Sequence, residues 1–327
     1  MTRKLKGVGL VSGGLDSILA VKVLQEQDLD LVGIVFTTPF FRPRNTSNLS
    51  LTLGIPLRIV DIGDHHLEML KNPRYGYGKN MNPCIDCHGL MLQEAGRIME
   101  LEGADFLFTG EVLGQRPMSQ RRDALRSVEN LSGYGGRILR PLSARLLPPT
   151  LMESRGEIDR EKLLDLQGRS RKRQMMLAEA YGIRDYAQPG GGCMLTKEGF
   201  ARRLRLLLAD RPHTVLREVE LLKYGRHFRL PGGVVLLVGR QRIDNERLSG
   251  LASENEALLR VRDYPGPVGL LLAPVDPSDL SLPAAIVVSY SDAPPGRPVR
   301  VEWRLGATQG SLMTVKDEEN ASREFLV

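Results

Sequence analysis

The residues best suited to chemistry form a glycine-containing loop near residue 10. A short apolar run ends at Val11, and Ser12-Gly13-Gly14 then leads into helix-forming residues from 15 to 26. Glycine lets the backbone approach a phosphate closely, and the free N–H groups of a helix start point towards it. Ser12 and Ser17 add hydroxyl donors, whereas Asp16 would repel a phosphate unless a magnesium ion lies between them. The pattern predicts a Mg²⁺-polyphosphate site, and it is neither a Walker loop nor a dinucleotide fingerprint.

The cysteines of the chain form the second candidate site. Cys84 and Cys87 have Cys-x-x-Cys spacing at a predicted helix start, and Cys193 follows Gly190-Gly191-Gly192. We expect the helix dipole to favour the thiolate of Cys87, and the glycines to let backbone N–H groups reach the Cys193 sulfur. Three chemistries fit this set: a 4Fe–4S cluster with one open iron, a structural zinc that adds His88, or a redox dithiol of Cys84 and Cys87.

The segments around these sites alternate between apolar strands and helices. Strands are predicted at residues 30–37, 57–62, 105–109 and 137–142, and helices at 87–102, 161–181 and 200–209. This alternation indicates an α/β fold, a doubly wound, Rossmann-like parallel sheet covered by helices on both faces. Because ligands of such sheets bind at the carboxyl ends of the strands, we expect Thr37, Thr109 and Gly110 to lie beside the Ser12 loop.

The string Ser12-Gly13-Gly14-Leu15-Asp16-Ser17 resembles the PP-loop of the N-type ATP pyrophosphatases. Residues 109–120 resemble the Gly-Gln-x-x-Ser-Gln segment of the tRNA 4-thiouridine synthetases, and Leu139-Arg140-Pro141-Leu142 fits the same motif order. The resemblance implies that ATP and Mg²⁺ are bound by Ser12, Gly13, Gly14, Asp16, Ser17, Thr37, Thr109, Gly110 and Gln115. It also implies that Cys84, Cys87 and Cys193 hold a 4Fe–4S cluster carrying the sulfur to be transferred, and so favours the cluster over zinc.

Two features depart from those synthetases. They usually carry an N-terminal RNA-capturing extension, whereas this loop begins almost at residue 1. Some also carry a C-terminal rhodanese domain with a persulfide cysteine, and no cysteine follows Cys193 in this sequence. We therefore expect RNA capture to lie elsewhere in the chain, and sulfur to arrive as sulfide or from a separate donor protein.

A second, smaller α+β domain is expected to capture RNA. Arg211-Pro212 marks the predicted boundary between a PP-loop domain (1–210) and an RNA-binding domain (211–327), with short strands at 225–230, 234–238 and 285–289. Residues 224–229 and 238–246 resemble the RNA-binding domain of ribosome-associated quality-control factors. The candidate RNA contacts are Arg171, Lys172, Arg226, Phe228, Arg229, Arg240 and Arg242. Phe228 or Tyr224 could stack on a base; the alternative is a solvated basic face with its aromatic residues in the core.

The composition fits a globular protein of two domains. The chain has 327 residues, of which 42% are hydrophobic and 26% charged, and its net charge of +6 permits a polyanionic partner. No apolar run approaches the roughly 20 residues of a membrane span. Only 3 cysteines indicate a reducing compartment, so we expect the cytoplasm.

Together these patterns predict an ATP-dependent tRNA sulfurtransferase, a thiouridine synthase. It would adenylate a uridine oxygen, release pyrophosphate and replace AMP by sulfur, with 4-thiouridine as the expected product. Its expected partners are tRNA and a sulfur donor, without a membrane, and a homodimer is a candidate assembly. Two alternatives stay open: a PP-loop ligase that delivers nitrogen to an adenylated RNA base with structural cysteines, and a non-catalytic, ATP-sensing RNA-binding factor.

Overall fold

The computed structural model describes residues 3–41, 46–186, 192–272, 276–316 and 321–327. The chain divides into two compact units, Met1–Lys197 and Glu198–Val327. Helix α8 (Glu198–Asp210), which the predicted boundary at Arg211-Pro212 placed in the first domain, therefore groups with the second unit. Pro212 follows the end of α8, whereas the division between the two units falls before this helix begins.

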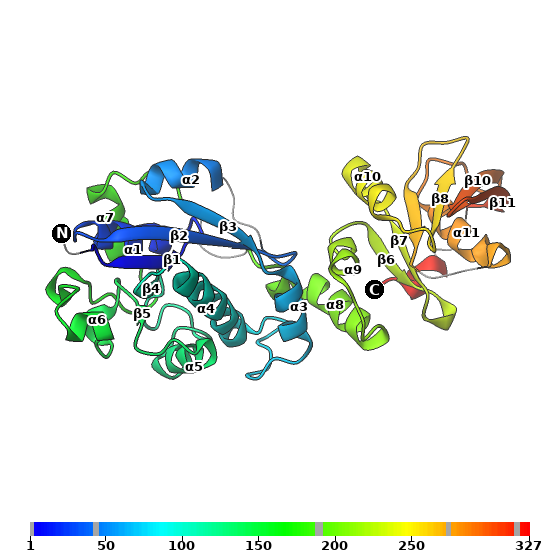
Figure 1. Ribbon diagram of the computed structural model, residues 1–327. Helices are drawn as coiled ribbons and strands as arrows, with labels where there is room; N and C mark the ends of the chain where they lie inside the picture. Colours follow the sequence, from blue (N-terminus) through cyan, green and yellow to red (C-terminus); the bar gives the residue numbers. More distant parts are fainter. Residues whose placement is uncertain (1–2, 42–45, 187–191, 273–275, 317–320) are drawn as a thin grey trace. The chain divides into compact units, whose positions relative to one another are not determined.

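The first unit contains a parallel sheet of five strands in the order β3-β2-β1-β4-β5 (Figure 1). Its strands are β1 (Lys6–Leu10), β2 (Asp30–Thr37), β3 (Leu57–Asp61), β4 (Phe106–Thr109) and β5 (Ile138–Leu139). β1 and β4 are neighbours, with Leu10 opposite Thr109, although they are far apart in the sequence. The chain reverses its winding direction there, and the loops after these two strands border the crevice in which such sheets bind ligands. The predicted doubly wound parallel sheet is confirmed.

Helices cover both faces of this sheet. One face packs against α1 (Leu15–Gln25), α2 (Thr46–Leu53) and α7 (Lys172–Ala180), and the other against α4 (Cys84–Leu101) and α5 (Arg122–Ser132). Successive strand residues point to opposite faces, so Phe106 and Phe108 join the core beneath α1 and Leu107 joins the core beneath α4. The unit also contains α3 (Gly63–Lys71) and α6 (Leu151–Ser154).

The second unit is an α+β domain around a six-stranded antiparallel sheet in the order β11-β10-β8-β9-β7-β6. Its strands are β6 (Arg226–Arg229), β7 (Val235–Val238), β8 (Ala257–Val261), β9 (Val268–Leu271), β10 (Pro298–Leu305) and β11 (Thr308–Val315). Helix α11 (Ser281–Ser289) packs on one face, and α9 (Leu216–Leu221) and α10 (Arg242–Leu251) pack on the other.

Two predicted elements are wrong. Residues 285–289 belong to α11 and not to a strand, because Ile286, Val287 and Val288 are buried in a helix too short and apolar for periodicity to reveal. The predicted helix at 161–181 is formed only at α7, since the preceding segment bonds to neighbouring loops through the N–H groups of Leu166 and Gly168. None of the helices in the described ranges is long and apolar enough to cross a membrane.

Candidate functional site

The loop between β1 and α1 is shaped by glycine and by its two serines. Gly13 has a φ of 74°, in the left-handed region that favours glycine, and Gly14 precedes α1 without a side chain that caps it. The backbone N–H of Ser12 donates to Ser17 Oγ at 3.3 Å, and Ser17 Oγ donates to the Gly14 carbonyl at 2.8 Å. The first N–H groups of α1 therefore stay available for an anion.

Asp16, in the first turn of α1, has one carboxylate oxygen bonded and one unbonded. Oδ2 accepts a hydrogen bond from Gln115 Nε2 at 3.0 Å, whereas Oδ1 is buried and has no partner among the described residues. Burial raises the pKa of Asp16, although Gln115, Arg171 and Arg116 oppose this rise. A buried carboxylate oxygen without a donor is suited to a cation, and Mg²⁺ takes one or two carboxylates beside a phosphate. The residues present therefore fit Mg²⁺.

Gly110 brings the end of β4 against this loop. A Cβ atom at Gly110 would lie 2.6 Å from backbone atoms of Asp16 and Ser17, so no larger residue fits without movement. The hydroxyl of the adjacent Thr109 is buried and donates to Glu111 Oε2 at 3.2 Å. Thr37, at the end of β2, donates its hydroxyl to Asp61 Oδ2 at 3.2 Å.

Residues 114–120 form a loop closed on itself by Gln120. The N–H of Gly114 donates to the Gln120 carbonyl at 2.7 Å, and the N–H of Arg116 donates to Gln120 Oε1 at 3.1 Å. Gln115 and Ser119 are separated by three residues in this chain, one more than in the Gly-Gln-x-x-Ser-Gln pattern. The resemblance of this segment is therefore looser than predicted.

The two ends of this loop contact the two candidate centres. Gln115 bonds to Asp16 at one end. At the other end, Met118 Sδ lies 3.5 Å from Asn82 Nδ2, which in turn donates to Cys84 Sγ at 3.3 Å. The nucleotide loop and the first cysteine are thus joined by one continuous set of contacts.

Arg116 lies between these ends and is a residue that the sequence reasoning missed. Its positive charge opposes the rise in the pKa of Asp16 and the rise in the pKa of Cys193. Arg116 is therefore within electrostatic range of both groups. Its side chain is exposed.

The three cysteines are free thiols that influence one another electrostatically. Burial raises the pKa of Cys87 well above its ordinary value, and Cys193 and Cys84 raise it further. Burial also raises the pKa of Cys193, although the backbone N–H groups of Leu195 and Thr196 oppose the rise. Burial thus opposes the thiolate that we expect the helix start to favour at Cys87, and that expectation stays a prediction.

These donors fit a cluster or metal that binds thiolates. No three His, Cys, Asp or Glu side chains in the described part of the chain already surround a common metal position. The thiols nevertheless share one electrostatic environment, and nitrogen atoms lie against two of the sulfurs: Asn82 Nδ2 donates to Cys84 Sγ, and His66 Nε2 is hydrogen-bonded to Cys87 Sγ. Such donors offset the negative charge of ligated sulfur. Gly190 and Gly191, expected to serve Cys193, lie outside the described residues.

His66 is the second residue that no motif identifies. Its Nε2 lies 3.2 Å from Cys87 Sγ, and its ring is fully buried, with centroids 5.0 Å from Phe40 and 5.7 Å from Phe41. Its Nδ1 has no hydrogen-bond partner among the described residues. Burial lowers the pKa of His66 to about 4, so the ring is neutral near pH 7.

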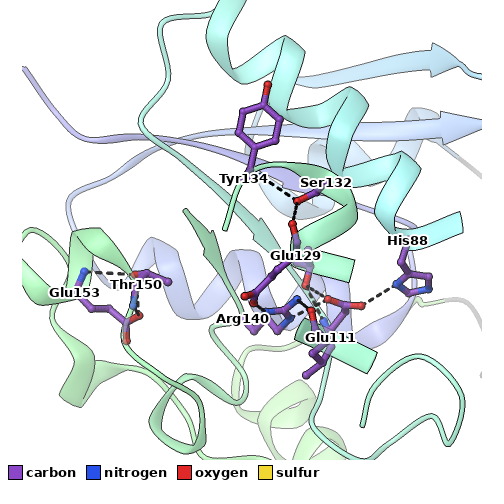
Figure 2. A network of polar contacts seen from close by, with 10 residues as sticks. His88, Glu111, Glu129, Ser132, Tyr134, Arg140, Thr150 and Glu153 are labelled. Atoms are coloured by element: carbon purple, nitrogen blue, oxygen red, sulfur yellow. Dashed lines mark hydrogen bonds and ion pairs between the residues drawn. The ribbon is translucent and has the colours of Figure 1, made fainter. Parts of the chain in front are cut away.

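Glu111 is the centre of a buried ion-pair network next to the site (Figure 2). Figure 2 shows His88 and Arg140 approaching Glu111, with His88 Nδ1 at 2.7 Å and Arg140 Nε at 2.9 Å. Burial alone would raise the pKa of Glu111, but Arg140 and His88 lower it to about 2. Arg140 also pairs with Glu129 on α5. His88, the residue that the zinc alternative adds, thus uses one ring nitrogen to hold α4 to the segment after β4.

The predicted RNA contacts occupy different environments. Arg171 lies near Asp16 in the first unit, and Lys172 is exposed at the start of α7. Phe228 is fully buried with its ring 5.8 Å from that of Tyr290, so the prediction that it stacks on a base is wrong. The alternation of β6 directs Phe228 into the core of the second unit. Tyr224 is half-buried, and its hydroxyl donates to a glutamate.

The remaining basic candidates make local contacts. The guanidinium of Arg226 lies 4.6 Å from the ring centroid of Tyr290. The other pairs are Arg229–Asp210 at 2.8 Å, Arg240–Asp244 at 3.1 Å and Arg242–Glu246 at 2.7 Å. The Arg242–Glu246 and Arg229–Asp210 pairs are exposed or half-exposed and contribute little to stability, so these two arginines can exchange their partner for a phosphate, whereas the Asp244 partner of Arg240 is buried.

Comparison with known proteins supports both halves of the resemblance. Residues 225–324 match the family of the NFACT protein RNA binding domain. The tRNA-specific 2-thiouridylase MnmA of Syntrophotalea carbinolica is 30% identical over 118 residues, which cover 31% of this chain and 32% of that protein. MnmA of Clostridium acetobutylicum is 31% identical over 119 residues, covering 31% and 34%. The chain thus spans about a third of the length of these curated relatives.

A solved 4-thiouridine synthetase–RNA complex with bound ATP is similar over 54% of this chain and 51% of its own, at 20% identity and a TM-score of 0.34. The sequence matches confirm the similarity of the chain to PP-loop tRNA-thiolating proteins and of residues 225–324 to this RNA-binding domain.

Proposed function

We propose, from these relationships and the geometry of the first unit, that the chain is an ATP-dependent tRNA sulfurtransferase of the cytoplasm that forms 4-thiouridine. The observation that carries the proposal is the loop of residues 114–120. It contacts the nucleotide loop through Gln115 and the cysteines through Met118 and Asn82. An enzyme that activates an oxygen with ATP and then replaces it with sulfur needs these two centres in one site.

At the nucleotide end, the chain provides donors and a metal ligand. The N–H groups at the start of α1 and the hydroxyl of Ser12 would bind the pyrophosphate of ATP. Asp16, oriented by Gln115, would hold the Mg²⁺ that offsets phosphate charge. Arg171 and Arg116 would add positive charge as the uridine oxygen attacks the α-phosphate and pyrophosphate leaves.

At the sulfur end, Cys84, Cys87 and Cys193 would ligate a 4Fe–4S cluster. With a cluster bound, the iron that no cysteine ligates would be open to carry the sulfur supplied as sulfide or by a donor protein. The hydrogen bonds of Asn82 to Cys84 and of His66 to Cys87 would hold the cysteine sulfurs in position. Sulfur forms a bond to the uracil carbon, the carbon–oxygen bond breaks, and AMP leaves with the former uridine oxygen. Arg116, which is within electrostatic range of Asp16 and Cys193, would stabilise the negative charge on that AMP.

The second unit would capture the tRNA. This role follows from the match of residues 225–324 to an RNA-binding domain and from the exposed arginines of the unit. The domain roles, the sulfur donor and a homodimeric assembly remain predictions.

The test is an anaerobic reaction of the purified chain with unmodified tRNA, ATP, Mg²⁺ and sulfide. We expect tRNA-dependent release of pyrophosphate and AMP, 4-thiouridine by nucleoside mass spectrometry, and about four irons per chain. Pyrophosphate release without sulfur in the nucleosides would favour the nitrogen-delivering ligase. ATP binding without pyrophosphate release would favour the sensing factor, and one zinc per chain would exclude the cluster.

A further inference from the structure

Helix α8 of the second unit carries an arginine whose charge is not paired. The Nε atom of Arg203 is buried without a hydrogen bond, and no hydrogen bond or ion pair of its guanidinium is made within the described part of the chain. Phe200, Leu204 and Leu207 anchor the same side of α8 in the interior. The backbone of Arg203 is therefore fixed, and its side chain is partly desolvated without compensation.

The groups near Arg203 are themselves positive or neutral. Burial lowers the pKa of Arg203, and the positive charges of Arg240 and Arg202 lower it further. His227 beside them is buried, and its Nε2 bonds to the Tyr224 carbonyl at 3.0 Å. Burial, followed by the charge of Arg203, lowers the pKa of His227 to about 3, so this ring adds no charge near pH 7.

Asp244, the acid that pairs with Arg240, already accepts several hydrogen bonds at one of its oxygens. The backbone N–H of Gly225, the backbone N–H of Arg240 and Arg240 Nε all donate to Asp244 Oδ2 at 3.1 Å. The Arg240 side chain stays 49% exposed. Arg203 thus lies within electrostatic range of Arg240 and Arg202, while the carboxylate that bonds to Arg240 already accepts three hydrogen bonds. Because like charges repel, this arrangement costs free energy unless an anion binds there.

We propose that Arg203, together with Arg240 and Arg202, forms a binding site for a backbone phosphate of RNA. Guanidinium groups bind phosphate oxygens through charge-assisted, often paired hydrogen bonds. Arg240 lies within residues 225–324, which match the RNA-binding domain, whereas α8 lies before them. Helix α8 would thus add to that domain a phosphate contact from outside the matched region. The inference rests on the proposed capture of tRNA by this unit.

The test measures tRNA affinity of the full chain across a salt series, for wild type, Arg203→Gln and Arg205→Gln. Arg205 is exposed on the same helix two residues away and so points elsewhere, which makes it a matched control. We expect Arg203→Gln to weaken binding about tenfold, as for the loss of one charge-assisted hydrogen bond. The slope of log affinity against log salt should fall by about 1, and Arg205→Gln should change both quantities much less.

Thermal unfolding separates binding from a structural role. Arg203→Gln should unfold at the same or a higher temperature, because it removes an uncompensated buried charge. Unchanged affinity and slope in this variant, or equal losses in both variants, would overturn the inference. Loss of stability together with affinity would assign Arg203 to the fold instead. If inorganic phosphate stabilises the protein through Arg203 while tRNA affinity is independent of it, the assignment to RNA fails. If the wild type does not bind tRNA, the proposed capture role and this site both fail.

Discussion

At the scale of single residues, the site depends on polar atoms that are buried without a partner. Asp16 Oδ1 and His66 Nδ1 both lack a hydrogen bond within the described residues. Each of these side chains is oriented by a bond through its other polar atom, to Gln115 and to Cys87. Proteins retain such groups at a cost in stability, and functional sites are where this cost is common.

Asp16→Asn should abolish ATP–pyrophosphate exchange without loss of the fold. The pKa of Asp16 is raised by burial, so its charged form costs stability above that pKa, and the cost disappears as the pH falls through it. The variant should therefore unfold at an equal or higher temperature at pH 7, and at the same temperature as wild type below about pH 4. Asp64→Asn, at an exposed position, is the control. Continued exchange by Asp16→Asn would remove the metal role.

His66→Phe should lower the reduction potential of the reconstituted cluster. The substitution keeps an aromatic ring beside Phe40 but removes the hydrogen bond between His66 Nε2 and Cys87 Sγ, and hydrogen bonds to cluster sulfurs help to set the potential. His66→Gln, which retains a donor, should recover part of the change. His65→Phe is the control, because His65 is exposed and pairs with Glu94. Equal potentials in all four proteins would show that His66 only fills space.

At the scale of elements, the two loops at the junction of β1 and β4 must pack without a gap. Gly110→Ala places a Cβ atom 2.6 Å from the backbone of Asp16 and Ser17. Backbone cannot move aside cheaply, so we expect a loss of about 1–3 kcal/mol in the free energy of unfolding and a large loss of pyrophosphate exchange. Chemical denaturation compares it with Gly135→Ala, where a Cβ atom meets nothing within 4 Å. Full activity of Gly110→Ala would mean that the two loops are not coupled.

The elements that the sequence predicts are those with a local signal. The parallel strands appear as apolar runs, and the PP-loop appears as glycines between a strand and a helix. The strand prediction at 285–289 failed because α11 is apolar all round. The stacking role predicted for Phe228 failed because side chains of a strand alternate between its two faces, and Phe228 lies on the face that is buried in the core. His66 and Arg116 could not be found, since tertiary packing alone brings them to Cys87 and Cys193.

At the scale of the whole molecule, the division at Lys197 determines which fragment can fold. Residues 1–197 should form a compact protein that binds ATP but has lost most of its tRNA affinity. Residues 1–210 should be less soluble, because this fragment ends in α8, which carries the apolar Phe200, Leu204 and Leu207 and groups with the second unit that the fragment lacks. Gel filtration and tRNA binding of both fragments test this boundary. Equal solubility, or full tRNA affinity of 1–197, would contradict the assignment of α8 and of RNA capture to the second unit.

The loop of residues 114–120 also has a thermodynamic consequence. Because it contacts Asp16 at one end and, through Asn82, Cys84 at the other, a shift of the loop on the proposed binding of ATP would change the free energy of loading sulfur at the cysteines. Linkage is reciprocal: the factor by which ATP alters the affinity for sulfur is the factor by which sulfur alters the affinity for ATP. Coupling through this loop of seven residues would favour reaction when both substrates are bound. It would also limit ATP hydrolysis when no sulfur is present.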